Sequence, residues 1–215
     1  MNKFTFVLIF FVAVNFCVTS DEINFPPELI WWLNKIKSAN SAVEIRGFTL
    51  HEQKTIRFSA HDLAGHLLAY PVFMRWNYSG NIFAYYCYNY ITLKRQNNGK
   101  YRIESGDIDS HLVLADRNKK IFFMESFGSM AGIDAYNWLT DTVLVAVGNW
   151  GNMLDTVDVF IRIYTINNAN RTVEIKIYNY ENALTFEDRN RLKLKWFEQR
   201  SDYFEEVTHD EYYSE

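Results

Sequence analysis

Cysteine is scarce in this chain of 215 residues, which contains only Cys17 and Cys87. Cys17 lies in an N-terminal segment that we expect to be removed, so that Cys87 alone would remain. A single cysteine excludes an internal disulfide, and the domain must then be held together by packing. Because Cys87 lies between Tyr86 and Tyr88, we interpret it as a small buried apolar residue rather than a reactive thiol.

Long apolar runs are absent beyond residue 20. The longest purely aliphatic run is residues 143–147, which is the length of a strand, whereas a membrane-spanning helix needs about 20 residues. No transmembrane segment is therefore expected once the N-terminal segment has been removed.

Positive charge is not in excess either. The chain has 22 Lys and Arg against 26 Asp and Glu, a net charge of −4. Residues 202–215 contain no Lys or Arg but include Asp202, Glu205, Glu206, Asp210, Glu211 and Glu215, so we expect an acidic tail at 201–215. Since the rest of the chain offers no basic face to neutralise phosphates, nucleic acid is not an expected partner.

Signatures of catalysis are missing. The sequence has no Gly-x-Ser-x-Gly nucleophile motif, no Gly-rich phosphate loop and no Cys-x-x-Cys pair. Nothing in it indicates a particular cofactor. These absences favour a non-enzymatic protein but leave an enzyme open, because catalytic carboxylates can come together only in the fold.

One short segment does combine possible metal ligands. Asp107, Asp109 and His111 lie within five residues and offer carboxylate oxygens and an imidazole to a divalent cation. The Asp-x-His spacing at 109–111 also occurs in metal-dependent phosphoesterases, but the Gly148-Asn149-Trp150 segment lacks the His expected to complete that pattern. A polar turn before a strand is the favoured interpretation.

The first twenty residues have the pattern of a secretory signal peptide. Lys3 provides a positive start, residues 4–16 are almost entirely apolar, and Val18-Thr19-Ser20 offers a cleavage site. We therefore expect export to a periplasmic or extracellular compartment. Lipidation of Cys17 is disfavoured because Phe16 precedes it.

Cleavage there would leave a single β-rich domain over residues 21–200, followed by the acidic tail. Two segments, Asn77-Tyr78-Ser79 and Asn170-Arg171-Thr172, match the N-glycosylation sequon, which matters only if the source is eukaryotic.

The rest of the pattern is that of antiparallel strands. Aliphatic residues alternate with other residues over 157–164 and again over 173–177, on either side of an Asn-rich turn, which predicts a hairpin. Asn97-Asn98-Gly99 predicts another. About ten strands at a spacing of roughly 8–12 residues indicate an antiparallel sandwich or a barrel-like sheet, with a small propeller-like fold as the alternative.

A helix is expected near each end of the domain. After Pro26-Pro27, the spacing of Leu29, Trp32, Leu33 and Ile36 predicts a short amphipathic helix. A capping pattern at Thr185-Phe186-Glu187-Asp188 predicts a second helix from there to about residue 207.

Two Gly- and Asn-rich segments, 126–140 and 148–155, are predicted to be long loops between strong strands, where binding sites usually lie. Asp134, Trp138, Asn149 and Trp150 in these segments are the candidate ligand-binding residues, suited to stacking and hydrogen bonding. The alternative is that both tryptophans close the ends of the core. Aromatic residues along 85–90 fit equally a packed core or a cavity for an apolar ligand.

Three functions remain open. The favoured hypothesis is an exported, non-enzymatic β-domain that binds a sugar, peptide or lipid through the loops at 126–140 and 148–155. The first alternative is a secreted metal-dependent hydrolase of a glycan or phosphoester that uses Asp107, Asp109 and His111. The second is a structural protein of the cell envelope.

Overall fold

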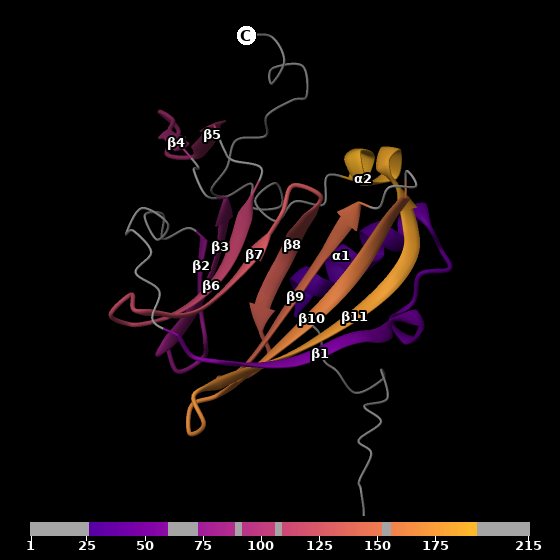
Figure 1. Ribbon diagram of the computed structural model, residues 1–215. Coiled ribbons are helices and arrows are strands. Elements are labelled where there is room, and N and C mark those ends of the chain that lie inside the picture. Colours follow the sequence, from indigo (N-terminus) through magenta and orange to yellow (C-terminus); the bar gives the residue numbers. More distant parts are fainter. Residues whose placement is uncertain (1–25, 60–72, 89–91, 106–108, 152–155, 193–215) are drawn as a thin grey trace, which may run out of the picture.

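The computed structural model describes residues 26–59, 73–88, 92–105, 109–151 and 156–192 (Figure 1). This part of the chain is mainly β-sheet and all of its strand pairs are antiparallel. It includes one helix before the first strand and another after the last. The predicted sandwich-like β fold with a helix toward each end is therefore confirmed, and propeller blades are not the arrangement seen.

The larger sheet, sheet A, has five strands. In spatial order these are β1 (Thr49–Arg57), β11 (Thr172–Thr185), β10 (Thr156–Asn167), β9 (Val143–Gly151) and β8 (Ala131–Trp138). Strands β10 and β11 form the hairpin predicted from their alternation, with Asn167 paired to Thr172 at its end.

The second sheet, sheet B, has four strands. Their order is β2 (Met74–Trp76), β3 (Ile82–Tyr88), β6 (Ser110–Asp116) and β7 (Ile121–Phe127). A separate two-stranded ribbon, β4 (Thr92–Arg95) and β5 (Tyr101–Ser105), turns at the predicted Asn-Asn-Gly site and extends beyond the two sheets (Figure 1).

The core lies between the two sheets because alternate residues of β10 face sheet B. Phe160 stacks on Phe127 with ring centroids 6.5 Å apart, and Tyr164 meets Phe123 edge-on at 5.9 Å. The intervening residues of β10, such as Ile161, face the other side of sheet A.

That other side is covered by helix α1 (Pro27–Ala39), which Figure 1 shows behind β9, β10 and β11. Pro27 occupies the first turn, where its missing N–H costs nothing. Leu29, Trp32 and Ile36, on one helical face, are between 0% and 3% exposed. A short 3₁₀ turn, η1 (Ile45–Gly47), leads from α1 to β1. The described chain thus has three layers: helix, sheet A and sheet B.

Helix α2 (Phe186–Leu192) begins at the predicted cap. The N–H of Asp188 donates to the hydroxyl of Thr185 at 3.0 Å, and that hydroxyl donates to the Asp188 carboxylate at 2.8 Å. The bond from Thr185, aided by Arg191, lowers the pKa of Asp188. The predicted continuation of this helix to residue 207 lies outside the described residues, as do the signal peptide and the acidic tail.

The prediction that the two Gly- and Asn-rich segments are long loops is wrong. Most of segment 126–140 is the end of β7 and strand β8, and segment 148–155 begins as the last residues of β9, with 152–155 outside the described residues. Glycine permits close packing here rather than loop flexibility. A Cβ at Gly148 would meet the carbonyl oxygen of Gly132 and would lie 2.5 Å from the Phe160 ring.

In the part of the chain that the structure describes, no helix is long and apolar enough to cross a bilayer.

Candidate binding site beneath helix α1

A β-bulge in β8 directs the Asp134 carboxylate toward α1. Ile133 pairs with Gly148 and Ala135 pairs with Val147, the adjacent residue of β9, so the register of the ladder shifts by one residue at Asp134. A bulge of this kind inserts one residue and redirects its side chain. Ile133 and Tyr136 can therefore both face sheet B while Asp134 lies under the helix.

Asp134 holds the helix to the sheet. The indole Nε1 of Trp32 donates to Oδ2 of Asp134 at 2.9 Å, and Nδ2 of Asn149 donates to Oδ1 and Oδ2 at 2.8 and 2.7 Å. All three residues are at most 4% exposed. Since a buried carboxylate is stable only when hydrogen-bonded, these bonds fix α1 against β8 and β9.

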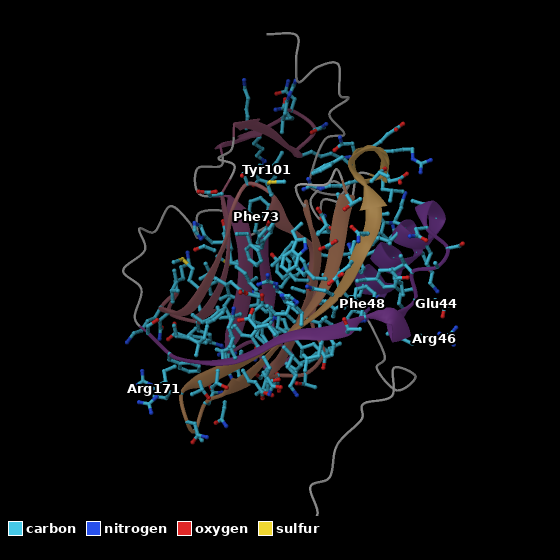
Figure 2. All side chains as sticks on the ribbon, turned by 45° about the vertical axis from the view of Figure 1, so that its right-hand side comes forward. Glu44, Arg46, Phe48, Phe73, Tyr101 and Arg171 are labelled. Carbon is cyan, nitrogen blue, oxygen red and sulfur yellow. The ribbon has the colours of Figure 1, made fainter. Side chains whose placement is uncertain are left out.

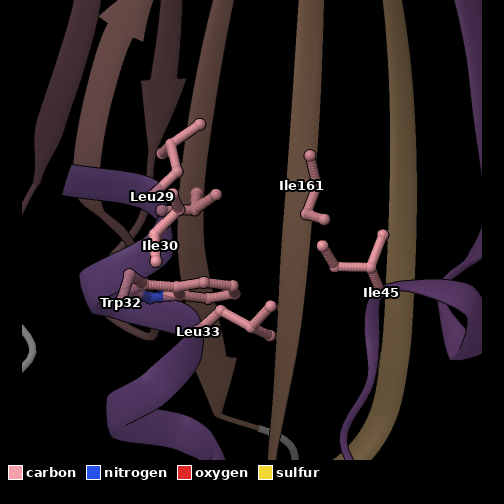
Figure 3. Close-up of a pocket in the computed structure, with 7 residues that line it drawn as sticks. Leu29, Ile30, Trp32, Leu33, Ile45 and Ile161 are labelled. Atoms are coloured by element: carbon pink, nitrogen blue, oxygen red, sulfur yellow. The ribbon is translucent and has the colours of Figure 1, made fainter. Parts of the chain in front are cut away.

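Beside this anchor, α1 leaves an apolar cavity of about 190 Å³. Figure 3 shows it between α1 and the segment carrying Ile45, over sheet A. It is lined by Leu29, Ile30, Trp32, Leu33, Ile45, Val147 and Ile161. Val147 lies two residues before Asn149 on the same face of β9, and Trp32 belongs to both the anchor and the cavity wall, so the two features form one site.

The size and lining of the cavity limit what it could hold. Pockets for drug-sized ligands have volumes of about 300–1,000 Å³, whereas an apolar cavity of about 150 Å³ stays dry and binds benzene. The lining here consists of apolar side chains and one indole ring. Ile30 is 49% exposed, so the cavity wall reaches the surface. The site therefore suits a small apolar group that enters past Ile30.

The four candidate ligand-binding residues separate onto two faces of sheet A. Asp134 and Asn149 come together beneath α1. Trp138 is 2% exposed and donates to the carbonyl of Arg75 at 2.7 Å, on the side toward sheet B. Trp150 is partly buried, contacts Phe160 and donates to Asp158 at 2.8 Å. The ligand-binding role of these residues stays a prediction.

The proposed metal ligands are only partly described. Asp107 lies outside the described residues, and Asp109 is exposed just before β6. Nδ1 of His111 is 2.9 Å from the hydroxyl of Ser126, its partner on β7. Over the described ranges no group of three or more His, Cys, Asp or Glu side chains could hold a metal ion; the trio with Asp107 stays a prediction.

A buried charged cluster between the sheets was not predicted. The Arg162 guanidinium lies 4.8 Å from the Phe127 ring and 4.7 Å from the Phe160 ring. Its Nη1 donates to Glu125 Oε1 at 2.5 Å, and the Tyr164 hydroxyl donates to Oε2 at 2.5 Å. The sequence signal was an arginine at an alternating position of β10, which reads as solvent-facing unless the partner strand is known.

Burial and charge act together on this cluster. Burial raises the pKa of Tyr164 well above its ordinary value, and the Glu125 carboxylate adds to the rise. Burial alone would lower the pKa of Arg162, but Tyr164 and Glu125 outweigh it and hold that pKa above its ordinary value. The cluster therefore joins the sheets as a charged guanidinium with a neutral phenol, while the buried Nε of Arg162 has no hydrogen-bond partner among the described residues.

No protein-family model, no curated protein and no solved structure matches this chain. The geometry of the described residues is therefore the basis on which a function can be inferred.

Proposed function

We propose that this protein is an exported β-domain that binds a small apolar ligand, such as the end of a lipid chain, in the cavity beneath α1. The observation that carries the proposal is the apolar cavity that reaches the surface at Ile30 beside the buried Trp32–Asp134–Asn149 anchor. Among the ligand classes left open by the sequence, sugars and most peptides need several polar contacts in their site. The apolar lining favours a lipid.

The proposed affinity is modest. Burial of about 150–200 Å² of apolar ligand surface contributes about 4–5 kcal/mol at 25 cal/mol per Å², before the cost of association. For a probe the size of benzene this corresponds to a Kd of about 1 mM or weaker. A longer ligand would bind more tightly through the part that extends past Ile30 over the outer surface of α1.

Export rests on the sequence of residues 1–20 and not on the described part of the chain. Packing between the three layers holds the described chain together without disulfides. Binding can be tested without reference to export, because the assay uses purified protein.

The binding test is a thermal-shift titration with benzene and with a series of straight-chain alcohols. A ligand that binds only the folded state raises the melting temperature by mass action. We expect a shift that grows with chain length in the alcohols, and none with glucose or short oligosaccharides at the same concentrations. A shift with sugars alone would contradict the proposal.

Two matched variants locate the site. Ile30→Trp places a large ring at the mouth of the cavity, whereas Leu50→Trp makes a similar change at a residue of β1 outside the cavity lining that is 53% exposed. We expect the ligand-induced shift to be lost in Ile30→Trp and kept in Leu50→Trp. Equal shifts in both variants, or no shift in the unmodified protein, would refute binding beneath α1.

A further inference from the structure

The two N-glycosylation sequons occupy opposite environments in the fold. Asn170 lies in the turn at the end of the β10–β11 hairpin, where residues 167–171 are all exposed. Figure 2 shows Arg171, the middle residue of that sequon, at the end of the hairpin and pointing away from the two sheets. Asn77 is only 5% exposed, in the turn between β2 and β3.

The Asn77 side chain holds its turn together through hydrogen bonds. Its Nδ2 donates to the carbonyl of Asp141 at 2.9 Å, and its Oδ1 accepts from the N–H groups of Asn81 and Ile82 at 2.9 and 3.2 Å. A sugar on Nδ2 would have to occupy the space where Asp141 packs. A chain modified at Asn77 could not form this turn.

The Asn170 side chain does not hold its turn in this way. Its backbone N–H donates to Oδ1 of Asn167 at 3.0 Å, which fixes the turn, while its own amide makes no hydrogen bond with the described residues. The turn is also held from outside, since Phe58 N–H donates to the carbonyl of Arg171 at 2.8 Å. Thr172, which supplies the hydroxyl that the sequon requires, is partly exposed at the start of β11.

We propose that Asn170 is an N-glycosylation site of the exported protein and that Asn77 is not. The inference rests on the export part of the proposed function. The donor is an oligosaccharide carried on a lipid pyrophosphate in the secretory compartment. Nδ2 of Asn170 forms a bond to C1 of the sugar, and the C1–O bond to the pyrophosphate breaks. That electron pair stays with the phosphate oxygen, and the amide loses one proton.

A glycan at this position leaves the cavity open. Ile161, which lines the cavity, is six residues from Asn167 along β10, or about 20 Å at the rise of a β-strand. The modification would cover the end of the hairpin, which projects away from the sheets (Figure 1). Ligand binding and glycosylation are therefore expected to be independent, so that failure of one does not imply failure of the other.

The test is secretion of the full chain from eukaryotic cells, once with its own N-terminus and once behind an established signal sequence. Peptide-N-glycosidase treatment in heavy-oxygen water converts each glycosylated Asn to a labelled Asp, which peptide mass spectrometry locates. We expect full-length secreted protein with label at Asn170 and none at Asn77. Thr172→Ala is expected to abolish the glycan, and Ser79→Ala to leave the mass shift of the glycan unchanged.

A designed acceptor serves as the matched positive control. Lys120→Thr creates a sequon at Asn118, which is likewise exposed in a hairpin turn, between β6 and β7. A glycan at Asn118 but none at Asn170 would overturn the assignment of Asn170. Label at Asn77 in folded, secreted protein would overturn the structural argument. Glycosylation only behind the added signal sequence would show that the natural chain does not carry the modification.

Discussion

Replacement of Trp32 by Phe tests whether the hydrogen bond to Asp134 holds α1 on sheet A. The variant keeps an aromatic ring in the helix but removes the Nε1–H that donates to Asp134 at 2.9 Å. A hydrogen bond to a charged group contributes about 1.5–3 kcal/mol. Complete truncation of a buried Trp costs about 3–5 kcal/mol, so the lost third of the ring accounts for about 1 kcal/mol.

We therefore expect Trp32→Phe to lower the free energy of unfolding by about 2.5–4 kcal/mol. For a domain of this size the melting temperature would fall by about 5–15 °C. Urea denaturation followed by circular dichroism measures the difference directly, and an unchanged m-value would show that the extent of unfolding is unchanged.

The neighbouring Trp31 provides the control. It is partly buried on the same helix and lies over Lys35, with Nζ 5.5 Å from the ring centroid. Trp31→Phe makes the same chemical change without the bond to Asp134, and the weakened cation–π contact costs about 1 kcal/mol or less. If Trp31→Phe and Trp32→Phe destabilise the protein equally, the Asp134 anchor does not do what we infer.

Two further predictions concern the core. Gly148→Ala places a Cβ 2.5 Å from the Phe160 ring and against a backbone carbonyl of β8, so it is expected to lower the free energy of unfolding by about 3 kcal/mol or more, while Gly128→Ala, with nothing within 4 Å, changes it little; equal melting temperatures would show that β8 and β9 are not so close. Because burial and Glu125 raise the Tyr164 pKa in the folded state, the unfolded phenol, with its pKa of about 10, ionises first, and stability is lost as the pH rises above about 10. Tyr164→Phe should reduce that loss. Urea titrations from about pH 8 to 11, a range that spans the phenol pKa, measure it. An identical pH dependence in the variant and the unmodified protein would contradict the raised pKa of Tyr164.

Local patterns were sufficient for much of the fold. The alternation on either side of the Asn167 turn predicts the β10–β11 hairpin, and the Thr185–Asp188 spacing predicts the cap of α2. In both cases the residues that interact are close in sequence, so the pattern contains the interaction.

Local sequence patterns could not predict how the residues of the candidate site come together. Trp32 and Asp134 are separated by 102 positions, and neither has a neighbour in sequence that indicates the other. Gly148 and Asn149 resembled loop residues because glycine and asparagine are depleted in strands. Their presence in β9 depends on a ring packed over one and a carboxylate beside the other, which only the folded chain supplies.

Asp134 is the inserted residue of the bulge in the β8–β9 ladder. Deleting it would leave Ile133 and Ala135 opposite Gly148 and Val147 in unbroken succession, and the alternation beyond them would stay in phase, with Tyr136 still toward sheet B. The sheet would close over the gap, but Trp32 would have no carboxylate to meet. The pairing of β8 with β9 thus does not depend on this inserted residue, whereas the attachment of the covering helix does.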